Sequence, residues 1–214
     1  MGKIVKKSAL GTIKGKVGRL VVNKWRKIDV VKSAPGKRIK ERITPLPDQS
    51  LRLSLVSHFL SRFKSDIRIG FYKKNNRIPP FQAAVQYNLQ HAVAGESPDF
   101  KIDYSKVVLS KGNLEMVWSE AIFLDENKML HISWEIPSTS KLKVVGMDTT
   151  HIIIYSHTLE KDLNAPDTVR QDLYAARDLK FFSGHTIYIW LFFTSTDHAA
   201  VSNSQYLGTV TVPK

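Results

Sequence analysis

The residues best suited to chemistry in this sequence are the cationic side chains of its first 42 positions. This stretch carries fourteen lysines and arginines against two acids, Asp29 and Glu41, so it holds +12 of the chain's net charge of +13. Lysine and arginine bind phosphates through charge, without reading base sequence. We therefore expect sequence-tolerant binding of nucleic acid or another polyanion. The candidate contacts are Lys3, Lys6, Lys7, Lys14, Lys16, Arg19, Lys24, Trp25, Arg26, Lys27, Lys32, Lys37, Arg38, Lys40 and Arg42.

Two patterns inside this stretch bear on its chemistry. Trp25 lies between two cations and could stack on an unpaired base, although a lone aromatic residue is more typical of a strand side chain facing a core. Residues 11–18 superficially resemble a phosphate-binding loop. However, only three residues separate its first two glycines, and Val17 follows Lys16 where serine or threonine would hold magnesium. A flexible basic backbone and a glycine-rich connection between strands are equally good interpretations.

Catalytic and metal-binding patterns are missing from the rest of the sequence. There is no cysteine, which excludes disulfides and thiolate metal sites. The seven histidines are scattered, and His151 and His157 are too far apart on an expected strand to bind one ion. No GxSxG nucleophile elbow occurs, although a triad assembled from distant positions is not excluded by composition. The sequence therefore predicts a non-enzymatic protein without metal or cofactor.

Three regions must position these side chains, and together they predict an α+β fold. Residues 1–42 combine glycine with β-branched residues, which favours two strands, roughly 17–25 and 27–33, turning near Arg26 and Lys27. This region is expected to be a basic β-arm, and residues 43–214 carry a net charge of only +1.

Residues 43–100 are predicted to form a helical hairpin. The first helix follows start signals at 44–48 and ends at Gly70. Its apolar stripe is Val56, Phe59, Leu60, Phe63 and Ile67. The second helix should begin at Pro79–Pro80 and stop at Gly95. Its buried side is expected to hold Phe81, Ala84, Val85, Leu89, Ala92 and Val93.

Residues 101–214 are predicted to form an all-β sandwich of immunoglobulin or fibronectin type. Strong strand patterns alternate with turn-prone stretches such as 137–140 and 164–167, at a spacing that is typical of such sandwiches. The expected strands are 107–109, 130–134, 151–155, 186–193 and 206–212.

Several short motifs are distinctive in combination, namely those at 15–18, 25–26, 31–35, 69–71, 80–88, 103–106 and 202–208. Together they make the chain similar to an uncharacterised family of basic proteins from Bacteroidetes-type bacteria. The resemblance covers nearly the whole chain but implies no substrate, cofactor or catalytic residue. The C-terminal part also resembles fibronectin-like sandwiches, with Trp134 placed like an early core tryptophan.

The main functional hypothesis is a binding or assembly protein. Its basic arm would contact nucleic acid or neighbouring subunits in a homo-oligomer or larger assembly, and its sandwich would make protein–protein contacts. A phage or phage-like particle component is one form of this hypothesis. No signal peptide or membrane span is evident, so a cytoplasmic or particle-associated location is expected. The alternative is a surface adhesion module whose sandwich binds a protein or glycan.

Overall fold

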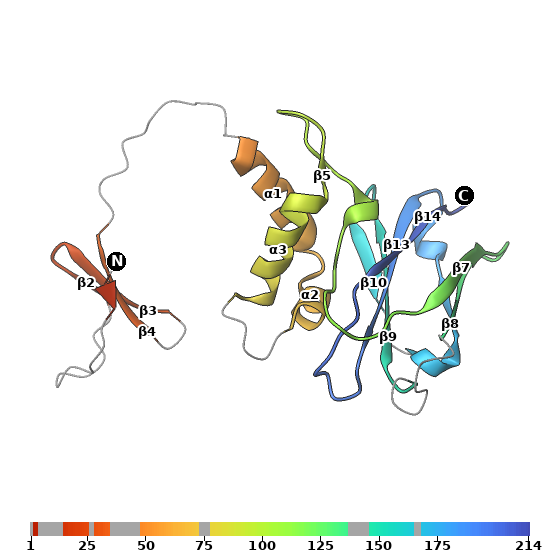
Figure 1. The fold of residues 1–214 in the computed structure, drawn as a ribbon. Coiled ribbons are helices and arrows are strands. Elements are labelled where there is room, and N and C mark those ends of the chain that lie inside the picture. Colours follow the sequence, from red (N-terminus) through yellow and green to blue (C-terminus); the bar gives the residue numbers. More distant parts are fainter. Residues whose placement is uncertain are drawn as a thin grey trace. The chain divides into compact units, whose positions relative to one another are not determined.

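The computed structural model describes residues 2–3, 15–25, 28–34, 48–72, 78–136, 146–164 and 168–214. The chain divides into two compact units, Met1–Pro45 and Leu46–Lys214, which are considered separately (Figure 1). The protein is a mixed α+β protein, with three α-helices in the described part of the chain and antiparallel sheets. No described helix combines the length and the apolar character needed to cross a lipid bilayer.

The first unit contains a four-stranded antiparallel sheet. Its strand order is β1-β4-β3-β2. The strand expected over 17–25 is confirmed from Leu20 to Trp25, but a two-residue turn at Gly18 and Arg19 separates it from Val17, which belongs to the preceding strand. Gly18 has a φ of 60°, a left-handed conformation that glycine adopts without steric strain. The expected turn at Arg26 and Lys27 lies outside the described residues. The strands are β1 Gly2–Lys3, β2 Gly15–Val17, β3 Leu20–Trp25 and β4 Ile28–Ser33.

The second unit begins with helices α1 Asp48–Leu60, α2 Lys64–Gly70 and α3 Pro80–His91. The first predicted helix is therefore two helices, although all five residues of its apolar stripe are buried as expected. The start of α3 at Pro80 is confirmed. The helix ends at His91, before the stop predicted at Gly95. Gly95 instead lies beyond β5 Val93–Ala94, which pairs with β6 Lys101–Ile102.

Two antiparallel sheets follow the helices. One has the strand order β10-β9-β13-β14, with β11 also paired to β9, and the other has the order β12-β8-β7. The strands predicted around residues 130, 151, 186 and 206 are confirmed as β8, β9, β13 and β14. The bounds are β7 Trp118–Leu124, β8 Met129–Glu135, β9 Thr149–Ser156, β10 Lys161–Asn164, β11 Thr168–Val169, β12 Tyr174–Asp178, β13 Thr186–Thr194 and β14 Gln205–Thr211.

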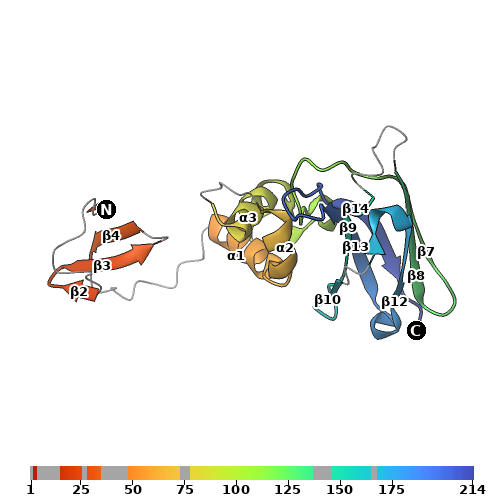
Figure 2. The same ribbon diagram turned by 90° about the horizontal axis from the view of Figure 1, so that it is seen from below.

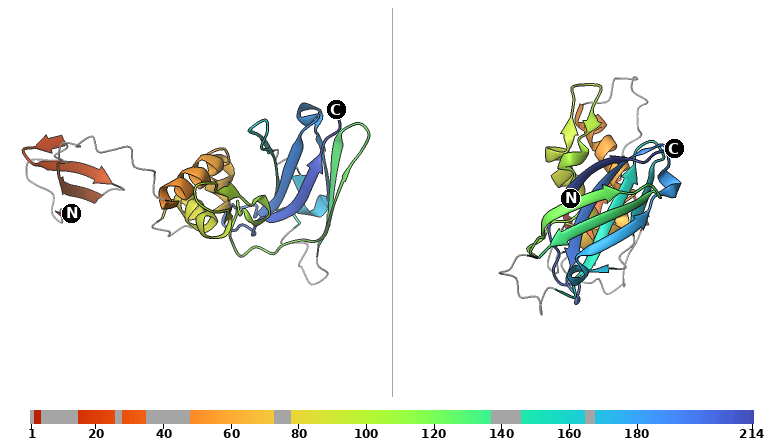
Figure 3. Two further views of the ribbon diagram at one scale, coloured as in Figure 1. Left: turned by 90° about the horizontal axis from the view of Figure 1, so that it is seen from above. Right: turned by 90° about the vertical axis from the view of Figure 1, so that its right-hand side faces the viewer.

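The helices and the two sheets form three layers, with the sheet that contains β9 and β13 in the middle (Figure 2). Side chains alternate across this sheet, so that Ile153 and Trp190 pack in the helix-side core while Ile154 and Ile189 pack in the core between the sheets. The central strands are therefore buried on both faces. In the right-hand view of Figure 3, the three-stranded sheet faces the viewer and the helices lie behind.

The strand expected at 107–109 is wrong, because no described strand includes these residues. The backbone there is hydrogen-bonded by side chains instead of by a neighbouring strand. The Asn88 amide donates to the carbonyl of Val108 at 2.8 Å and accepts from its N–H at 2.8 Å. The N–H of Leu109 donates to the hydroxyl of Ser204 at 2.9 Å. The segment is therefore attached to α3 and to the β13–β14 connection.

Gly70 is the position where α2 approaches this segment most closely. A Cβ added there would lie 2.5 Å from the carbonyl oxygen of Leu109 and 2.7 Å from the Cβ of Ser110. We expect Gly70→Ala to lower the free energy of unfolding by about 1–3 kcal/mol, although alanine is the better helix former. Urea unfolding measures this change, with Gln90→Ala on the exposed side of α3 as the control. Equal or greater stability of Gly70→Ala would contradict the close packing.

Candidate functional site

Four cations of the predicted polyanion site have described side chains, and all four are exposed. They are Lys16 in β2, Arg19 in the β2–β3 turn, Lys24 in β3 and Lys32 in β4. No ion pair of these residues occurs among the described residues. Lys3 and Trp25 lie within β1 and β3. The other candidates lie outside the described residues: Lys6, Lys7, Lys14, Arg26, Lys27, Lys37, Arg38, Lys40 and Arg42.

The register of the sheet brings two of these cations to one face. Lys16 and Lys32 are both Cα partners of Val21, so the three residues form a row across β2, β3 and β4. Directly opposed residues project from the same face of a sheet, and two strand spacings separate the lysine Cα atoms by about 10 Å. Lys24 lies an odd number of positions from Val21 and therefore projects from the opposite face. The sheet thus groups Lys16 with Lys32 but not with Lys24.

The opposite face of this sheet, from which Lys24 projects, also carries exposed apolar side chains. Val17 and Leu20 are directly opposed and keep 59% and 49% of their surfaces exposed. Val22 and Val31, which are also opposed, are only half-buried. Exposed apolar surface of this kind is typical of a contact region. The described part of this unit therefore has one face with Lys16 and Lys32 and another on which apolar side chains accompany Lys24.

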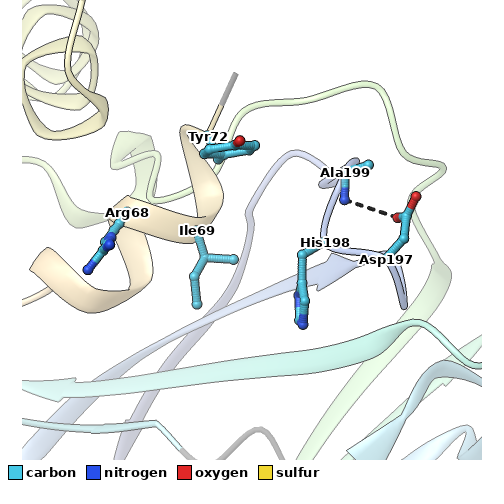
Figure 4. A pocket seen from close by; sticks show the side chains of 6 residues that line it. All are labelled: Arg68, Ile69, Tyr72, Asp197, His198 and Ala199. Atoms are coloured by element: carbon cyan, nitrogen blue, oxygen red, sulfur yellow. Dashed lines mark hydrogen bonds between the residues drawn. The ribbon is translucent and has the colours of Figure 1, made fainter. Parts of the chain in front are cut away.

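A cavity of about 600 Å³ in the second unit has polar side chains on its walls. Arg68, Ile69 and Tyr72, from the end of α2, lie on one side, and the loop with Asp197 and His198 lies on the other (Figure 4). The Asp197 carboxylate accepts hydrogen bonds from the Ser195 hydroxyl at 2.6 Å and the Ala199 N–H at 3.0 Å. These bonds lower the pKa of Asp197 and fix the turn. The carboxylate therefore has a structural role in the loop.

His151 is the most unusual histidine of the second unit. It is 4% exposed, and its ring stacks on Phe192 with centroids 4.5 Å apart. Neither ring nitrogen has a hydrogen-bond partner among the residues that the structure describes. Burial, with a smaller contribution from the charge of His198, lowers the pKa of His151 to about 4. The imidazole is thus a neutral core side chain at pH 7. Sequence analysis could not identify it, because the strand pattern around it does not show which face the helices cover.

The arrangement of side chains in the described part of the chain does not support metal binding. No three histidine or acidic residues there come together in a way that could hold an ion. The cations identified from the sequence and the polar groups around Asp197 belong to different compact units. We therefore treat the Lys16–Lys32 face as the candidate binding surface.

The model of a family of unknown function (DUF6266) matches residues 12–208. The chain belongs to this family. Membership in DUF6266 confirms the resemblance to an uncharacterised family, and the match extends across both compact units. No curated protein matches the sequence. DUF6266 therefore supplies no activity, and the function must be argued from the residues.

Proposed function

We propose that this DUF6266 protein is a non-enzymatic binding and assembly protein whose basic N-terminal sheet contacts nucleic acid or another polyanion without sequence specificity. The observation that carries the proposal is the row Lys16–Val21–Lys32, which presents two exposed lysines on one face within a segment of net charge +12. Such an excess of positive charge repels itself unless an anionic partner or an assembly compensates it. Phosphate contacts of this kind give affinity without base recognition.

The assembly part of the proposal rests on the exposed apolar side chains of the sheet's other face. Val17 and Leu20 remain about half exposed, and a neighbouring subunit would cover them. The second unit would then provide protein contacts through a sandwich that we propose to be immunoglobulin- or fibronectin-like. A homo-oligomer, as in a phage or phage-like particle, would combine both roles, and a bacterial source of Bacteroidetes type is part of this proposal.

The test changes charge without removing any segment. Lys16→Glu/Lys32→Glu is compared with Lys161→Glu/Lys180→Glu, an equal charge change at exposed positions of the second unit. Binding to a duplex and to a single-stranded oligonucleotide is measured by fluorescence anisotropy over a range of salt concentrations. For duplex DNA, each lost phosphate contact should reduce the slope of log affinity against log salt by about 0.9. We expect this loss only in the Lys16/Lys32 variant.

Equal weakening by both double variants would contradict the proposal, because it would show that net charge alone matters. Removing residues 1–42 provides a second readout, since most of the excess charge lies there. If the shortened chain binds nucleic acid as well as the full chain, the basic sheet is not the binding surface. Circular dichroism of each variant shows whether the fold is retained.

A second candidate function, an adhesion module, is favoured by aromatic side chains on the outer face of the three-stranded sheet. Phe123 and His131 are Cα partners with ring centroids 6.0 Å apart, and Tyr174 stacks on His131 at 5.9 Å. Trp118 is 67% exposed on β7. This face could bind a glycan or a protein. Partner binding that is unchanged by Lys16→Glu/Lys32→Glu would favour this alternative.

A further inference from the structure

A second cavity, of about 480 Å³, lies between α1, the segment that contains β6, and the end of β9. Its walls are aromatic. Phe59 contacts Tyr104 and Tyr155 edge to face, with ring centroids 5.6 and 5.5 Å apart. Rings prefer such edge-to-face or offset contacts with other rings, and the attraction adds to that from buried area. The walls are therefore suited to binding the aromatic ring of a ligand.

The inner end of the cavity carries a hydrogen-bond donor. Tyr155 is 2% exposed and lines the cavity, and among the described residues its hydroxyl has no hydrogen-bond partner. Because Tyr155 lines the cavity, a ligand acceptor that enters it can accept a hydrogen bond from this hydroxyl. Burial raises the pKa of Tyr155, so the hydroxyl keeps its proton at neutral pH. This end of the cavity thus suits a ligand oxygen.

The outer end of the cavity is positive. Arg62 is neutralised by Glu160, with 2.7 Å between its Nη2 and the carboxylate Oε2, and it also donates to the Glu160 carbonyl at 2.8 Å. Lys101 is exposed on β6 and forms no ion pair with the described residues. The exposed imidazoles of His58 and His157 also line this end. The charge left unpaired at the opening is therefore that of Lys101.

We propose that this cavity binds a small aromatic acid. The ring would lie against Phe59 and Tyr104, an oxygen at its inner end would accept from the Tyr155 hydroxyl, and its acidic group would lie beside Lys101. The order of burial fixes this orientation, because Tyr155 is inside and Lys101 is at the opening. The proposal is independent of polyanion binding, since the cavity belongs to the second compact unit.

Three matched probes test this orientation on the full chain. 4-Hydroxybenzoate carries both polar ends, benzoate lacks the inner oxygen, and 4-hydroxybenzamide lacks the negative charge. Titrations followed by two-dimensional NMR should give saturable shifts around Phe59, Lys101 and Tyr104. We expect each simpler probe to bind about 2- to 10-fold more weakly, as is typical for the loss of one hydrogen bond or charge contact.

Two variants test whether Tyr155 and Lys101 cause the preference for 4-hydroxybenzoate over the simpler probes. Tyr155→Phe should leave stability unchanged, because no described residue forms a hydrogen bond with the hydroxyl. The substitution should abolish the preference for 4-hydroxybenzoate over benzoate. Lys101→Gln should weaken both acids and leave the amide unaffected. Lys180→Gln, an exposed lysine on the 3₁₀ helix Lys180–Phe182, is the control and should change none of the three affinities.

The proposal is overturned if no probe gives saturable shifts up to about 10 mM, a range that covers weak ligands. It is also overturned if the shifts map to the Arg68–Tyr72 cavity, or if folded Tyr155→Phe keeps the wild-type preference. Lys16→Glu/Lys32→Glu should bind the probes as wild type does. A failure of polyanion binding and a failure of this cavity site are therefore separate results.

Discussion

Arg170→Met is expected to lower the free energy of unfolding by about 3–5 kcal/mol, because it leaves the buried Asp148 carboxylate without its ion-pair partner. The two side chains are 1% and 2% exposed, with 3.5 Å between Arg170 Nη1 and Asp148 Oδ2. Burial raises the pKa of Asp148 and lowers that of Arg170, so each charge depends on the other. The guanidinium also lies over the Phe193 ring, 4.3 Å from its centroid.

A double-mutant cycle separates the ion pair from the lost packing. Asp148→Leu/Arg170→Met removes both charges and should recover much of the stability lost in Arg170→Met, since an apolar pair avoids the desolvation of two ions. Lys180→Met is the control, because its pair with Asp178 is exposed and should change stability by less than about 1 kcal/mol. Additive effects in urea unfolding would show that the buried charges are not coupled.

Acid should destabilise the protein through His151. The pKa of His151 is about 4 in the folded state against 6.5 as its ordinary value, so between these pH values the unfolded chain binds a proton that the folded chain does not. Stability is therefore complete above pH 6.5 and decreases as the pH falls toward 4, by up to about 3 kcal/mol. Urea unfolding at pH 7.5 and pH 4.5 measures this loss.

His151→Phe preserves an aromatic ring against Phe192 and removes the titrating nitrogens. We expect its stability to fall less than that of wild type over this pH range, and His157→Gln, at an exposed position, to behave as wild type. Burial raises the pKa of the carboxyls of Asp66, Asp148 and Asp162, which gives a contribution of opposite sign near their pKa values. This contribution is shared by wild type and variant, so the difference between them isolates His151. An equal loss in His151→Phe would contradict the assignment.

The sequence pattern predicted the central strands but not what covers them. The continuous apolar runs of β9 and β13 are typical of strands buried on both faces. Only the structure shows that the helices cover the second face of the central sheet. The rings of Phe63 and Trp190 are in contact there, although the two residues are far apart in the sequence. The weakly apolar strand β12 gave no local signal. β12 forms a strand because its residues, such as Ala175 and Arg177, pair with those of β8.

The candidate surfaces were predictable in part. Charge alone identified the basic segment, but the pairing of Lys16 with Lys32 across Val21 depends on the turn at Gly18, which divides a stretch expected to be one strand. The aromatic cavity was not predictable. Its walls come from segments around residues 59, 104 and 155, and their rings converge only after the helices pack on the central sheet.

The order of the layers along the chain also has a consequence for biosynthesis. The helices, Asp48–His91, are made before β9 and β13, the strands that cover their apolar faces. A ribosome adds roughly 5–20 residues per second, so roughly 6–25 s pass between synthesis of Phe63 and synthesis of the first residue of β13. During that interval the nascent helical segment exposes surface that can aggregate. We therefore expect the nascent helical segment to bind chaperones until the strands that cover it have been made.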